Sequence, residues 1–538
     1  MEQKILCGAV KALFAVALVG ALAGCGGGGD SGGSLTPAPA ATAAAVITST
    51  STESVKVGGS TSITVDAFDA NGKRENFSFT SIQPNATVVQ SGGTLTVSGL
   101  SVGRQIIDIT SASGAKKSVT VDIYDPLTMD IGGGLMIKYV NTFDQRFINN
   151  GFAGIGFGRV GDHDYAAWHP RTGGNGWYAL GSYIRHGWDD VNATRDYAMI
   201  VVKDTSATHD RLAAPVGFNL VWSNLRGGSP VFFTDASVWA PQCPAGYVAL
   251  GLVVSDKSQV PPSSEDVRCV KSENTVPAKV GGWIIDDRGS RADLDLTVFN
   301  LDQPDNVLPE EGTGFVPAGT VVAARTPGSV QDRNQVDAGT AHMLRVNFPV
   351  VRSGDSRDYE PRLNGFAPFE PRVSRSVAGV RVPFPLVKDP DPAHTLDWKI
   401  SNSPFYTIVR EEVYSSGKAL DNRQATLTGT LAYETEAGWS QQDYSKFTQE
   451  VGIEMTTGGD FKFASWEVKV SVKLGWEQST ATTYSTVERT TYTWPVPPGT
   501  FAQVIQVTSQ MRVLAETGHD AGVLPMKSNI MKYLQYPR

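Results

Sequence analysis

The sequence predicts an all-β protein with three β domains behind a leader and a linker. Short stretches alternate apolar and polar residues with period two, and turn signals rich in Gly separate them. No long helical pattern of Ala, Leu, Glu and Lys interrupts these stretches. The chain has 538 residues, and hydrophobic residues make up 41% of it. This length and composition suggest about three or four domains with buried cores.

The charge balance argues against one class of partner. Asp and Glu number 54 against 46 for Lys and Arg, so the net charge is -8. A general nucleic-acid binder needs a basic face that displaces counterions from phosphates. We therefore expect no nucleic-acid partner.

Residues 1–24 have the layout of a signal peptide. Lys4 and Lys11 precede an apolar run that ends at Ala23 and is too short to span a bilayer comfortably. The run ends in Leu22-Ala23-Gly24-Cys25, which resembles the lipobox of bacterial lipoproteins. The resemblance implies that Cys25 is acylated, with chains such as palmitate, and becomes the first mature residue. The alternative is an ordinary cleaved signal followed by a chance Cys.

Gly26 follows Cys25, and this residue pattern in lipoproteins implies transfer to the outer membrane. Residues 25–43 form a Gly-rich and then Pro/Ala-rich linker that would hold the folded part away from the bilayer. We therefore expect a lipid-anchored protein at a bacterial outer membrane. It would face the periplasm or the outside, or be released by proteolysis.

The cysteines that remain after leader removal and lipidation are Cys243 and Cys269. An oxidising compartment favours one disulfide between them. The alternative is two free or metal-binding thiols, but two Cys without paired His nearby make a poor zinc site.

Residues 44–124 read as a small β-sandwich. Apolar residues alternate before and after the turn Gly58-Gly59, and Asn71-Gly72 is a hairpin signal. The stretch from Val55 to Val65, together with Asp69-Ala-Asn-Gly72, resembles a bacterial immunoglobulin-like domain. That resemblance implies a stalk or spacer.

Residues 130–350 contain an internal repeat. Gly176-Trp-Tyr-Ala-Leu-Gly181 recurs as Gly246-Tyr-Val-Ala-Leu-Gly251 and, more weakly, as Gly314-Phe-Val-Pro-Ala-Gly319. An upstream motif recurs with it, as 164–168, 235–239 and 295–299. One small β unit cannot bury its own apolar face, whereas three around an axis can. The repeat therefore predicts a closed, pseudo-threefold β-prism.

The aromatic residues of these motifs are candidates for ligand recognition, with core packing as the alternative for each. They are Trp168, Trp177, Tyr178, Trp239, Tyr247, Phe299 and Phe315.

The stretch from Trp239 to Gly251, followed by Val267-Arg-Cys-Val270, is similar to the vacuolar protein sorting-associated protein 62 family. Related β-prism modules bind membranes or glycans, so the resemblance implies a glycan or lipid receptor rather than an enzyme substrate. Cys243 and Cys269 bracket the second copy, where a disulfide would join its two motifs.

Residues 351–399 read as a connector rich in Pro, Arg and Asp, and residues 400–538 as an elongated β domain. Long strands rich in Ser and Thr, an amphipathic hairpin and the turn Val496-Pro-Pro-Gly-Thr500 resemble the pore-forming region of aerolysin-type toxins. The resemblance implies that protomers oligomerise on a target bilayer and form a β-barrel pore. The alternative is a surface adhesin that binds a glycan or a membrane and forms no pore.

The expected membrane-inserting hairpin spans residues 447–474, with a bulge near Ser465. A transmembrane strand needs about 9–11 residues, and a lone hairpin cannot enter lipid because its edges are unsatisfied. An ordinary hairpin in a half-solvated sheet is the alternative. The apolar face would comprise Val451, Ile453, Met455, Phe461, Phe463, Trp466, Val468, Val470, Val472 and Leu474.

Enzyme signals are weak, so no catalytic residue, metal or cofactor is predicted. Gly154–Gly158 is glycine-rich but lies in no βαβ pattern, and Asp162 and Asp164 with His169 fit no standard metal spacing. Asp189, Asp190, Asn192 and Asp196 could hold calcium but lack the turn glycine of an EF-hand loop. The adjacent pairs Asp286-Asp287 and Glu310-Glu311 are interpreted as solvated.

Overall fold

The computed structural model describes most of the chain and is mostly β, which confirms the predicted fold class. The chain divides into two units, Met1–Ala43 and Ala44–Arg538, and the first lies outside the described residues together with Cys25. The described residues are 45–49, 52–149, 165–187, 189–224, 235–287, 294–305, 307, 310, 312–324, 332–348, 351–352, 361, 363, 365–369, 372–437, 440–455, 461–463, 470–471, 488–526 and 530–537.

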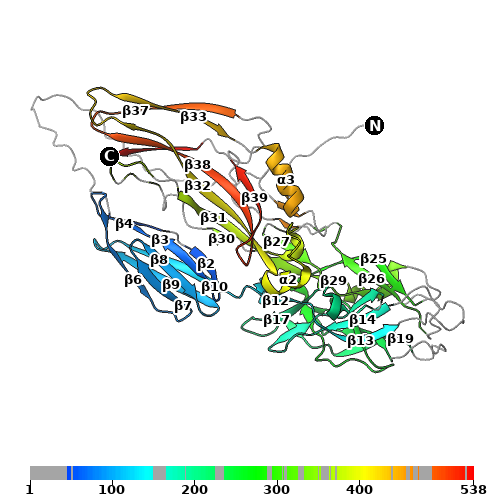
Figure 1. Ribbon diagram of the computed structural model, residues 1–538. Helices are drawn as coiled ribbons and strands as arrows, with labels where there is room; N and C mark the ends of the chain where they lie inside the picture. Colours follow the sequence, from blue (N-terminus) through cyan, green and yellow to red (C-terminus); the bar gives the residue numbers. More distant parts are fainter. Residues whose placement is uncertain are drawn as a thin grey trace, which may run out of the picture. The chain divides into compact units, whose positions relative to one another are not determined.

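The N-terminal β domain is a sandwich (Figure 1), as predicted. One layer is the sheet β2-β10-β9-β6, and the other is made by β1-β4-β5 and β3-β8-β7. Its strands are β1 (Val46–Thr48), β2 (Thr52–Lys56), β3 (Ser60–Thr64), β4 (Asp66–Phe68), β5 (Arg74–Glu75), β6 (Phe77–Ser81), β7 (Ala86–Ser91), β8 (Thr94–Gly99), β9 (Gly103–Ser111) and β10 (Lys116–Tyr124).

Alternation explains this sandwich. Leu95 and Val97 of β8 are fully buried and face Ile107 and Ile109 of β9, while the residues between them are less buried. The hairpin between β4 and β5 turns at Gly72, whose φ of +76° is a conformation that suits glycine.

The second domain contains three sheets with one strand order, β13-β14-β16, β19-β20-β22 and β25-β26-β28. The central strands carry the upstream sequence motif, and each pairs with its first neighbour through a β-bulge or irregularity. These strands are β13 (Phe143–Asn149), β14 (Tyr165–Pro170), β16 (Tyr183–His186), β19 (Gly217–Ser223), β20 (Ser237–Gln242), β22 (Val253–Ser255), β25 (Lys279–Asp286), β26 (Thr297–Asp302) and β28 (Val322–Ala324).

Three further sheets complete the repeat: β11-β12-β17-β15, β18-β23-β21 and β24-β29-β27, the last extended by β36. Their elements are β11 (Met129–Asp130), β12 (Leu135–Val140), β15 (Trp177–Ala179), α1 (Val191–Thr194), β17 (Met199–Asp204), β18 (Leu212–Ala213), β21 (Tyr247–Val248), β23 (Cys269–Lys271), η1 (Ser272–Asn274), β24 (Thr275–Pro277), β27 (Thr313–Val316), η2 (Arg333–Gln335), η3 (Ala338–Thr340), β29 (His342–Asn347) and β36 (Val470–Ser471).

The three copies meet around a shared core, as the repeat predicts. One cluster joins Ala167, Val238 and Val298 from the three central strands. The backbone of the copies is also linked, because Ser182 N donates to Leu252 O at 2.7 Å and Leu252 N donates to Val321 O at 3.0 Å. The final glycine of the second motif, Gly251, lies where this approach is tightest.

The C-terminal sheet has the strand order β30-β31-β32-β38-β39, and β40 also pairs with β38. Its strands are β30 (Val351–Arg352), β31 (Arg372–Pro383), β32 (Phe405–Asp421), β38 (Phe501–Ala515), β39 (Asp520–Met526) and β40 (Met531–Tyr536). β30 and β31 fall within residues 351–399, which the sequence predicted to be a connector. That prediction needs correction, because β31 pairs with β32 along the length of β31.

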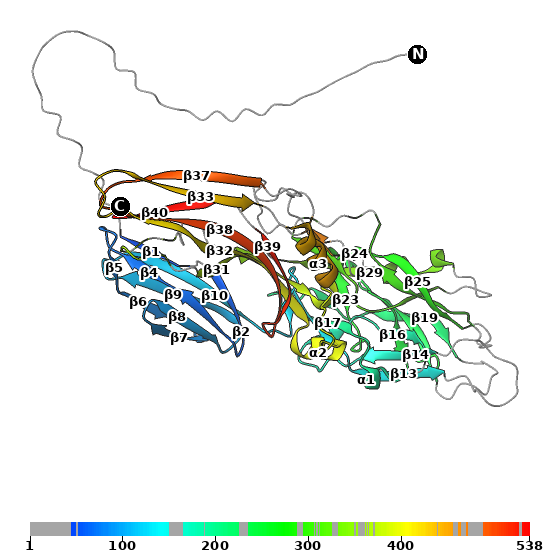
Figure 2. The same ribbon diagram turned by 45° about the horizontal axis from the view of Figure 1, so that its top comes forward.

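Helices and small sheets cover this sheet. Helix α2 (Leu396–Asn402) follows the short turn η5 (Phe384–Leu386), and α3 (Gln441–Val451) packs against β39. A two-stranded ribbon, β33 (Gly429–Ala437) with β37 (Glu488–Val496), lies against β32 and β38, as Figure 2 shows. A second small hairpin joins β34 (Ile453–Met455) to β35 (Phe461–Phe463).

A buried ion pair ties the chain segment after β10 to this sheet. Arg381 of β31 pairs with Glu516 at 2.6 Å, and the Glu516 side chain is 2% exposed. Arg381 also donates to the backbone carbonyl of Pro126 at 2.7 Å and to that of Thr128. Tyr124 completes the group by donating to Glu516 at 3.0 Å.

Candidate functional site

Four of the motif aromatics lie in the interior. Trp168 and Phe315 are 1% exposed, Phe299 is fully buried and Trp239 is 7% exposed. A ligand in solvent has no access to side chains this deeply buried. Their burial favours the core-packing role that the sequence left open beside recognition.

The remaining motif aromatics are half-buried. Trp177 lies under the Lys138 ammonium at 4.8 Å, and Tyr178 lies under the Arg268 guanidinium at 3.9 Å. Tyr247 donates its hydroxyl to Asp210 O at 2.7 Å. A recognition role for these three residues stays a prediction.

The predicted disulfide between Cys243 and Cys269 is present. Its Cα atoms are 5.8 Å apart, within the usual range for such a bond. Cys243 directly follows β20 and Cys269 begins β23, so the bond joins the two sheets of the second copy.

A cavity of about 700 Å³ lies between the first copy, the third copy and the η5 segment. That volume is typical of small-ligand pockets, which are mostly apolar with a few placed polar groups. The first copy contributes Tyr183, Tyr197 and Ile200, the third copy contributes Leu301, Gln303 and Val316, and the η5 segment contributes Pro383, Phe384 and Leu386.

Two residues that line this cavity each carry a buried polar atom without a hydrogen-bond partner. Among the described residues, neither the Tyr139 hydroxyl nor Gln303 Oε1 has a hydrogen-bond partner. Gln303 is held in place by its Nε2, which donates to Phe315 O at 2.8 Å. An unpaired buried polar group costs about 1–3 kcal/mol, so a hydrogen bond made to either atom would be favourable.

A stacked pair of tyrosines and an ion pair are among the residues that line the cavity. The rings of Tyr183 and Tyr197 stack with centroids 3.4 Å apart, and Tyr197 donates to Gly319 O at 2.8 Å. Burial raises the pKa of Tyr183 to about 12, so its hydroxyl stays protonated at neutral pH. Arg185 and Asp196 also line the cavity and pair with each other at 3.1 Å.

Sequence analysis did not single out the cavity residues. The signal that could have found them is a break in the repeat. Tyr183 stands opposite Trp168, where the other copies place Val253 opposite Trp239 and Val322 opposite Phe299. A residue that departs from the pattern of its own repeat marks a place where one copy has a separate task.

Weak metal and catalytic candidates from the sequence have structural roles where they are described. His169 is 5% exposed, and its ring nitrogens lie 3.0 Å from Ser182 Oγ and 3.1 Å from Asp266 O. Burial lowers the pKa of His169 to about 4. Asp190 caps α1 by accepting from Asn192 N.

The pair Asp286-Asp287 was expected to be solvated, and this expectation was wrong. Asp286 is 1% exposed and Asp287 5%. Asp287 accepts from Trp222 Nε1 at 2.7 Å and from Leu296 N at 2.8 Å, which satisfies the buried carboxylate. Glu310 is exposed, whereas 154–158, 162–164 and 311 lie outside the described residues.

The expected membrane-inserting hairpin differs at its start. Phe447 and Val451 lie in α3, which follows the N-cap Ser440 and ends at Val451, with Gly452 as its C-cap. Ile453, fully buried, pairs with Phe463 across the β34–β35 hairpin. Met455 and Phe461 pair at its other end, and Val470 pairs with Gly314 of the repeat. Trp466, Val468, Val472, Leu474 and the bulge at Ser465 lie outside the described residues.

The β33–β37 ribbon is amphipathic across its thickness. Leu431 and Val496 are buried against Ala502 and Val504 of β38. The alternate residues of β33, such as Thr430 and Glu434, are exposed. Residues 438–487 connect the two strands of the ribbon, so the short hairpin and α3 both belong to this connection.

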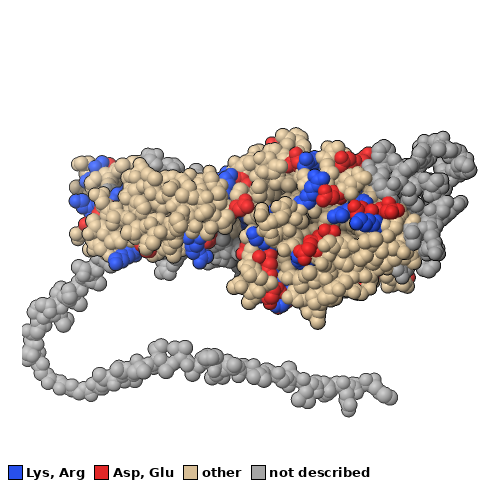
Figure 3. Space-filling view, turned by 90° about the horizontal axis from the view of Figure 1, so that it is seen from below, with Lys and Arg blue, Asp and Glu red and all other residues tan. Residues whose placement is uncertain are grey.

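On the face drawn in Figure 3, acidic and basic side chains of the described residues lie intermingled. Much of this face is uncharged, and neither sign of charge forms a continuous patch on it. Within the described part of the chain, no helix combines the length and the apolar character needed to cross a bilayer.

Comparison with known proteins supports one of the four resemblances. Residues 128–341 match the vacuolar protein sorting-associated protein 62 family. The match covers the repeat domain and confirms the resemblance that its motifs carry. The immunoglobulin-like and aerolysin-like assignments remain resemblances. No curated protein sequence matches the chain.

Solved structures show similarity over parts of the chain. GNIP1Aa from Chromobacterium piscinae is 21% identical, with a TM-score of 0.30 over 38% of this chain and 35% of that one. Cry35Ab1 is 9% identical, with a TM-score of 0.27 over 61% of this chain and 89% of that one. Domains 4 and 5 of the S-layer protein SbsC are 29% identical, with a TM-score of 0.14 over 14% and 50%. The chain thus spans about a third of GNIP1Aa, and we draw no functional conclusion from these similarities.

Proposed function

We propose that this protein binds a target surface through the cavity of its repeat domain, and that the ligand is a membrane lipid. The observation that carries the proposal is a cavity of about 700 Å³ whose lining is mainly apolar. An acyl chain would fill the apolar part, and its polar end would satisfy the Tyr139 hydroxyl and Gln303 Oε1. This role needs no catalytic residue, so we propose binding rather than enzyme activity.

Filling the cavity tests the lipid proposal. Ala198 lines the cavity, and Ala207 is exposed on the same domain. We expect Ala198→Trp to abolish co-sedimentation of the full, unacylated chain with vesicles that the native unacylated chain binds. Ala207→Trp should leave binding unchanged. Vesicles of phosphatidylcholine alone and with added target-membrane lipid extract are the probes. If the chain binds glycans and Ala198→Trp does not weaken that binding, the result would support the adhesin alternative instead.

The β33–β37 ribbon favours a second function, membrane insertion by several protomers. Each strand has 9 residues, close to the length that crosses a bilayer. Extending both strands with residues from 438–487 would lengthen the ribbon without changing its register. Several ribbons would then close a barrel, because open strand edges are excluded from lipid. The burial of Phe447, Val451 and Ile453 opposes this step, since these side chains must first leave the core.

A disulfide lock tests the insertion step. A Cβ atom built on Gly522 of β39 lies 2.4 Å from Val451 Cγ1, so the two positions are close enough for a cysteine bridge. We expect the double variant Val451→Cys/Gly522→Cys to stop dye release from vesicles until it is reduced. Each single variant is a control, and the native chain with reductant controls for loss of the Cys243–Cys269 bond. Leakage from the oxidised double variant would rule out release of α3 as a required step. If the native chain binds vesicles but releases dye from none of them, the result would favour an adhesin that forms no pore.

We further propose that acylation of Cys25 anchors the protein at the bacterial outer membrane. The support is the sequence Leu22-Ala23-Gly24-Cys25 behind the leader. Several acyl chains form a lasting anchor, because each buried methylene contributes about 0.8 kcal/mol. Growth with labelled palmitate should label the native chain in the outer-membrane fraction. Label retained by Cys25→Ser would contradict the assignment.

A further inference from the structure

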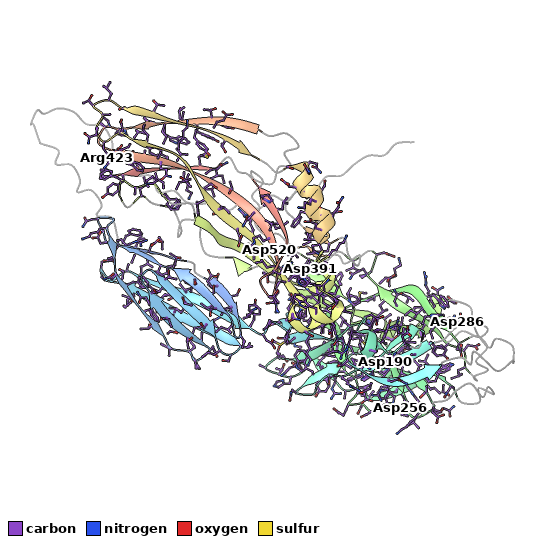
Figure 4. The ribbon with its side chains drawn as sticks, viewed as in Figure 1. Asp190, Asp256, Asp286, Asp391, Arg423 and Asp520 are labelled. Carbon is purple, nitrogen blue, oxygen red and sulfur yellow. A yellow bond between two sulfur atoms is a disulfide. The ribbon has the colours of Figure 1, made fainter. Side chains whose placement is uncertain are left out.

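Two histidines from distant segments meet at the end of the C-terminal sheet. His394 lies in the loop before α2, and His519 lies in the turn between β38 and β39. Their rings meet edge to face, with centroids 4.8 Å apart. Asp389, His394 and His519 each offer one ligand-type atom, and these atoms all lie within 4.8 Å of one another. Figure 4 labels Asp391 and Asp520, the neighbours of this cluster, close to α2.

The His394 ring is fixed by its surroundings. Its Nδ1 lies 2.6 Å from Asp389 Oδ2, and the Asp389 side chain is fully buried. Trp398 stacks on the ring with centroids 3.6 Å apart. Tyr406 and the backbone N–H of Asp391 also donate to Asp389. The contact therefore makes Nδ1 the protonated nitrogen and leaves the lone pair on Nε2, the arrangement that metal-binding histidines adopt beside a carboxylate.

The free side of His394 faces ligand-type atoms. Its Nε2 lies 3.7 Å from Asp391 Oδ2, which is too far for a hydrogen bond. Two ligands of a tetrahedral zinc ion with bonds of about 2.1 Å lie about 3.4 Å apart, close to that spacing. Among the described residues, neither His394 Nε2 nor the His519 ring has a hydrogen-bond partner. Asp520 is engaged elsewhere, since both its oxygens pair with Arg512.

We propose that Asp391, His394 and His519 bind one transition-metal dication, with Zn²⁺ the best fit and water at the fourth position. Two imidazoles and one carboxylate suit zinc, whereas calcium and magnesium prefer oxygen ligands alone. Asp389 orients His394 from behind and does not itself bind the ion. Asp389 and Asp391 supply two negative charges for the dication, partly offset by Lys399, which acts electrostatically on Asp389.

The ion would join two parts of the fold that the backbone does not link directly. The 389–394 loop leads from the η5 segment to α2, and His519 closes the β38–β39 turn. His519 is exposed, so its ring has room to turn toward His394 and Asp391. Metal binding should therefore stabilise the end of the sheet without depending on ligand binding at the repeat domain.

Titration with Zn²⁺ tests the site. The full chain would be alkylated first, so that neither Cys7 nor Cys25 can bind the metal. We expect one Zn²⁺ per chain, and with Co²⁺ the strong visible bands of a tetrahedral ion. His394→Gln and His519→Gln should each weaken binding at least about 100-fold, since each removes a ligand. Asp389→Asn should weaken it about 10–100-fold and keep the tetrahedral Co²⁺ spectrum, because it acts through His394.

His209→Gln is the matched control, because His209 is an exposed histidine of the repeat domain. It should bind Zn²⁺ like the native chain. If circular dichroism shows that His394→Gln does not fold, the test rests on His519→Gln, which changes an exposed side chain. Absence of bound Zn²⁺ at about 100 μM would overturn the proposal. Unchanged binding in His519→Gln would overturn it equally.

Discussion

Single glycines decide how closely the three copies of the repeat approach. Gly251 has a φ of +145°, and a Cβ atom there would lie 2.5 Å from the Thr320 Cβ. Gly181 meets the same threonine, with a Cβ position 2.9 Å from Thr320 Cγ2. The glycines that the sequence motifs repeat are therefore positions of contact between copies as well as turns.

We predict that Gly251→Ala destabilises the repeat domain by about 2–4 kcal/mol, through strain at positive φ and overlap with Thr320. Gly246→Ala is the control, because Gly246 also has positive φ (+84°) but nothing lies within 4 Å of its Cβ position. It should cost about 1 kcal/mol. Thermal unfolding followed by near-ultraviolet circular dichroism measures both. Equal losses would show that the close approach is not what requires glycine.

His169 gives the repeat domain a pH dependence of known sign. Burial and Arg146 lower the pKa of His169 to about 4, below the ordinary value of 6.5, while Asp266 opposes the shift. Its stabilising contribution is present above pH 6.5 and is lost as pH falls towards 4, because the unfolded chain then binds the proton.

Lowering the pH from 7 to 5 should reduce the free energy of unfolding by about 2 kcal/mol through His169 alone. His169→Gln should flatten the slope of stability against pH in this window. Exposed His209→Gln should keep the native slope. Denaturant titrations at both pH values provide the test, and a native slope in His169→Gln would refute the assignment.

At the scale of elements, the alternation of apolar and polar residues predicted strands well where one face of the sheet is buried. It predicted them poorly where the same apolar residues can also form the buried face of a helix. Val451, Ile453 and Met455 alternate, so they were interpreted as one strand. The pair Phe447 and Val451 is also spaced four apart, with Ser440 and Gly452 at the two ends. Helix caps and packing on β39 decide in favour of α3 up to Val451. The local sequence supports both readings, and the tertiary contacts choose between them.

The ribbon β33–β37 is held by few buried side chains, so it should open separately from the sheet below it. Leu431 is 4% exposed in the cluster that joins ribbon and sheet. Leu431→Ala should cost about 3 kcal/mol locally and speed amide exchange in β33 and β37. Exchange in β12 and β17 should stay the same. Leu427→Ala, at a side chain that is 77% exposed, is the control. Slower or uniform exchange would contradict a separately opening ribbon.

The Cys243–Cys269 bond stabilises the second copy by closing a loop of sequence separation 26. Replacing both cysteines with alanine should lower the stability of the repeat domain by about 3 kcal/mol. Thermal midpoints of the native and doubly substituted chains measure the loss. An unchanged midpoint would mean that the second copy is held by its sheets alone.

At the scale of the whole molecule, the all-β fold class was predictable because alternating apolar and polar residues recur along the chain. The start of the C-terminal sheet was not. Its strand β31 lies in a stretch rich in Pro and Arg, and its pairing partner β32 follows η5 and α2. The cavity could not be predicted from the sequence either, because its lining comes from the first copy, the third copy and the η5 segment, which lie far apart along the chain.

Arg381 should contribute strongly to the stability of the C-terminal sheet. Arg381→Ala leaves the Glu516 carboxylate buried at 2% exposure without its partner, which should cost about 3–5 kcal/mol. It also removes donors from the carbonyls of residues 125–128, so proteolysis there should speed up. Adding Glu516→Ala should restore part of the stability. Additive losses in the double variant, measured by denaturant unfolding, would show that the two residues act independently.

The two ends of the repeat domain meet. Asn347 N, near its end, donates to Ile131 O, near its start, at 2.8 Å. A domain with adjoining ends enters and leaves the surrounding fold at nearly the same place. It also tolerates circular permutation, with the ends joined and new termini opened at the exposed loop around Thr208.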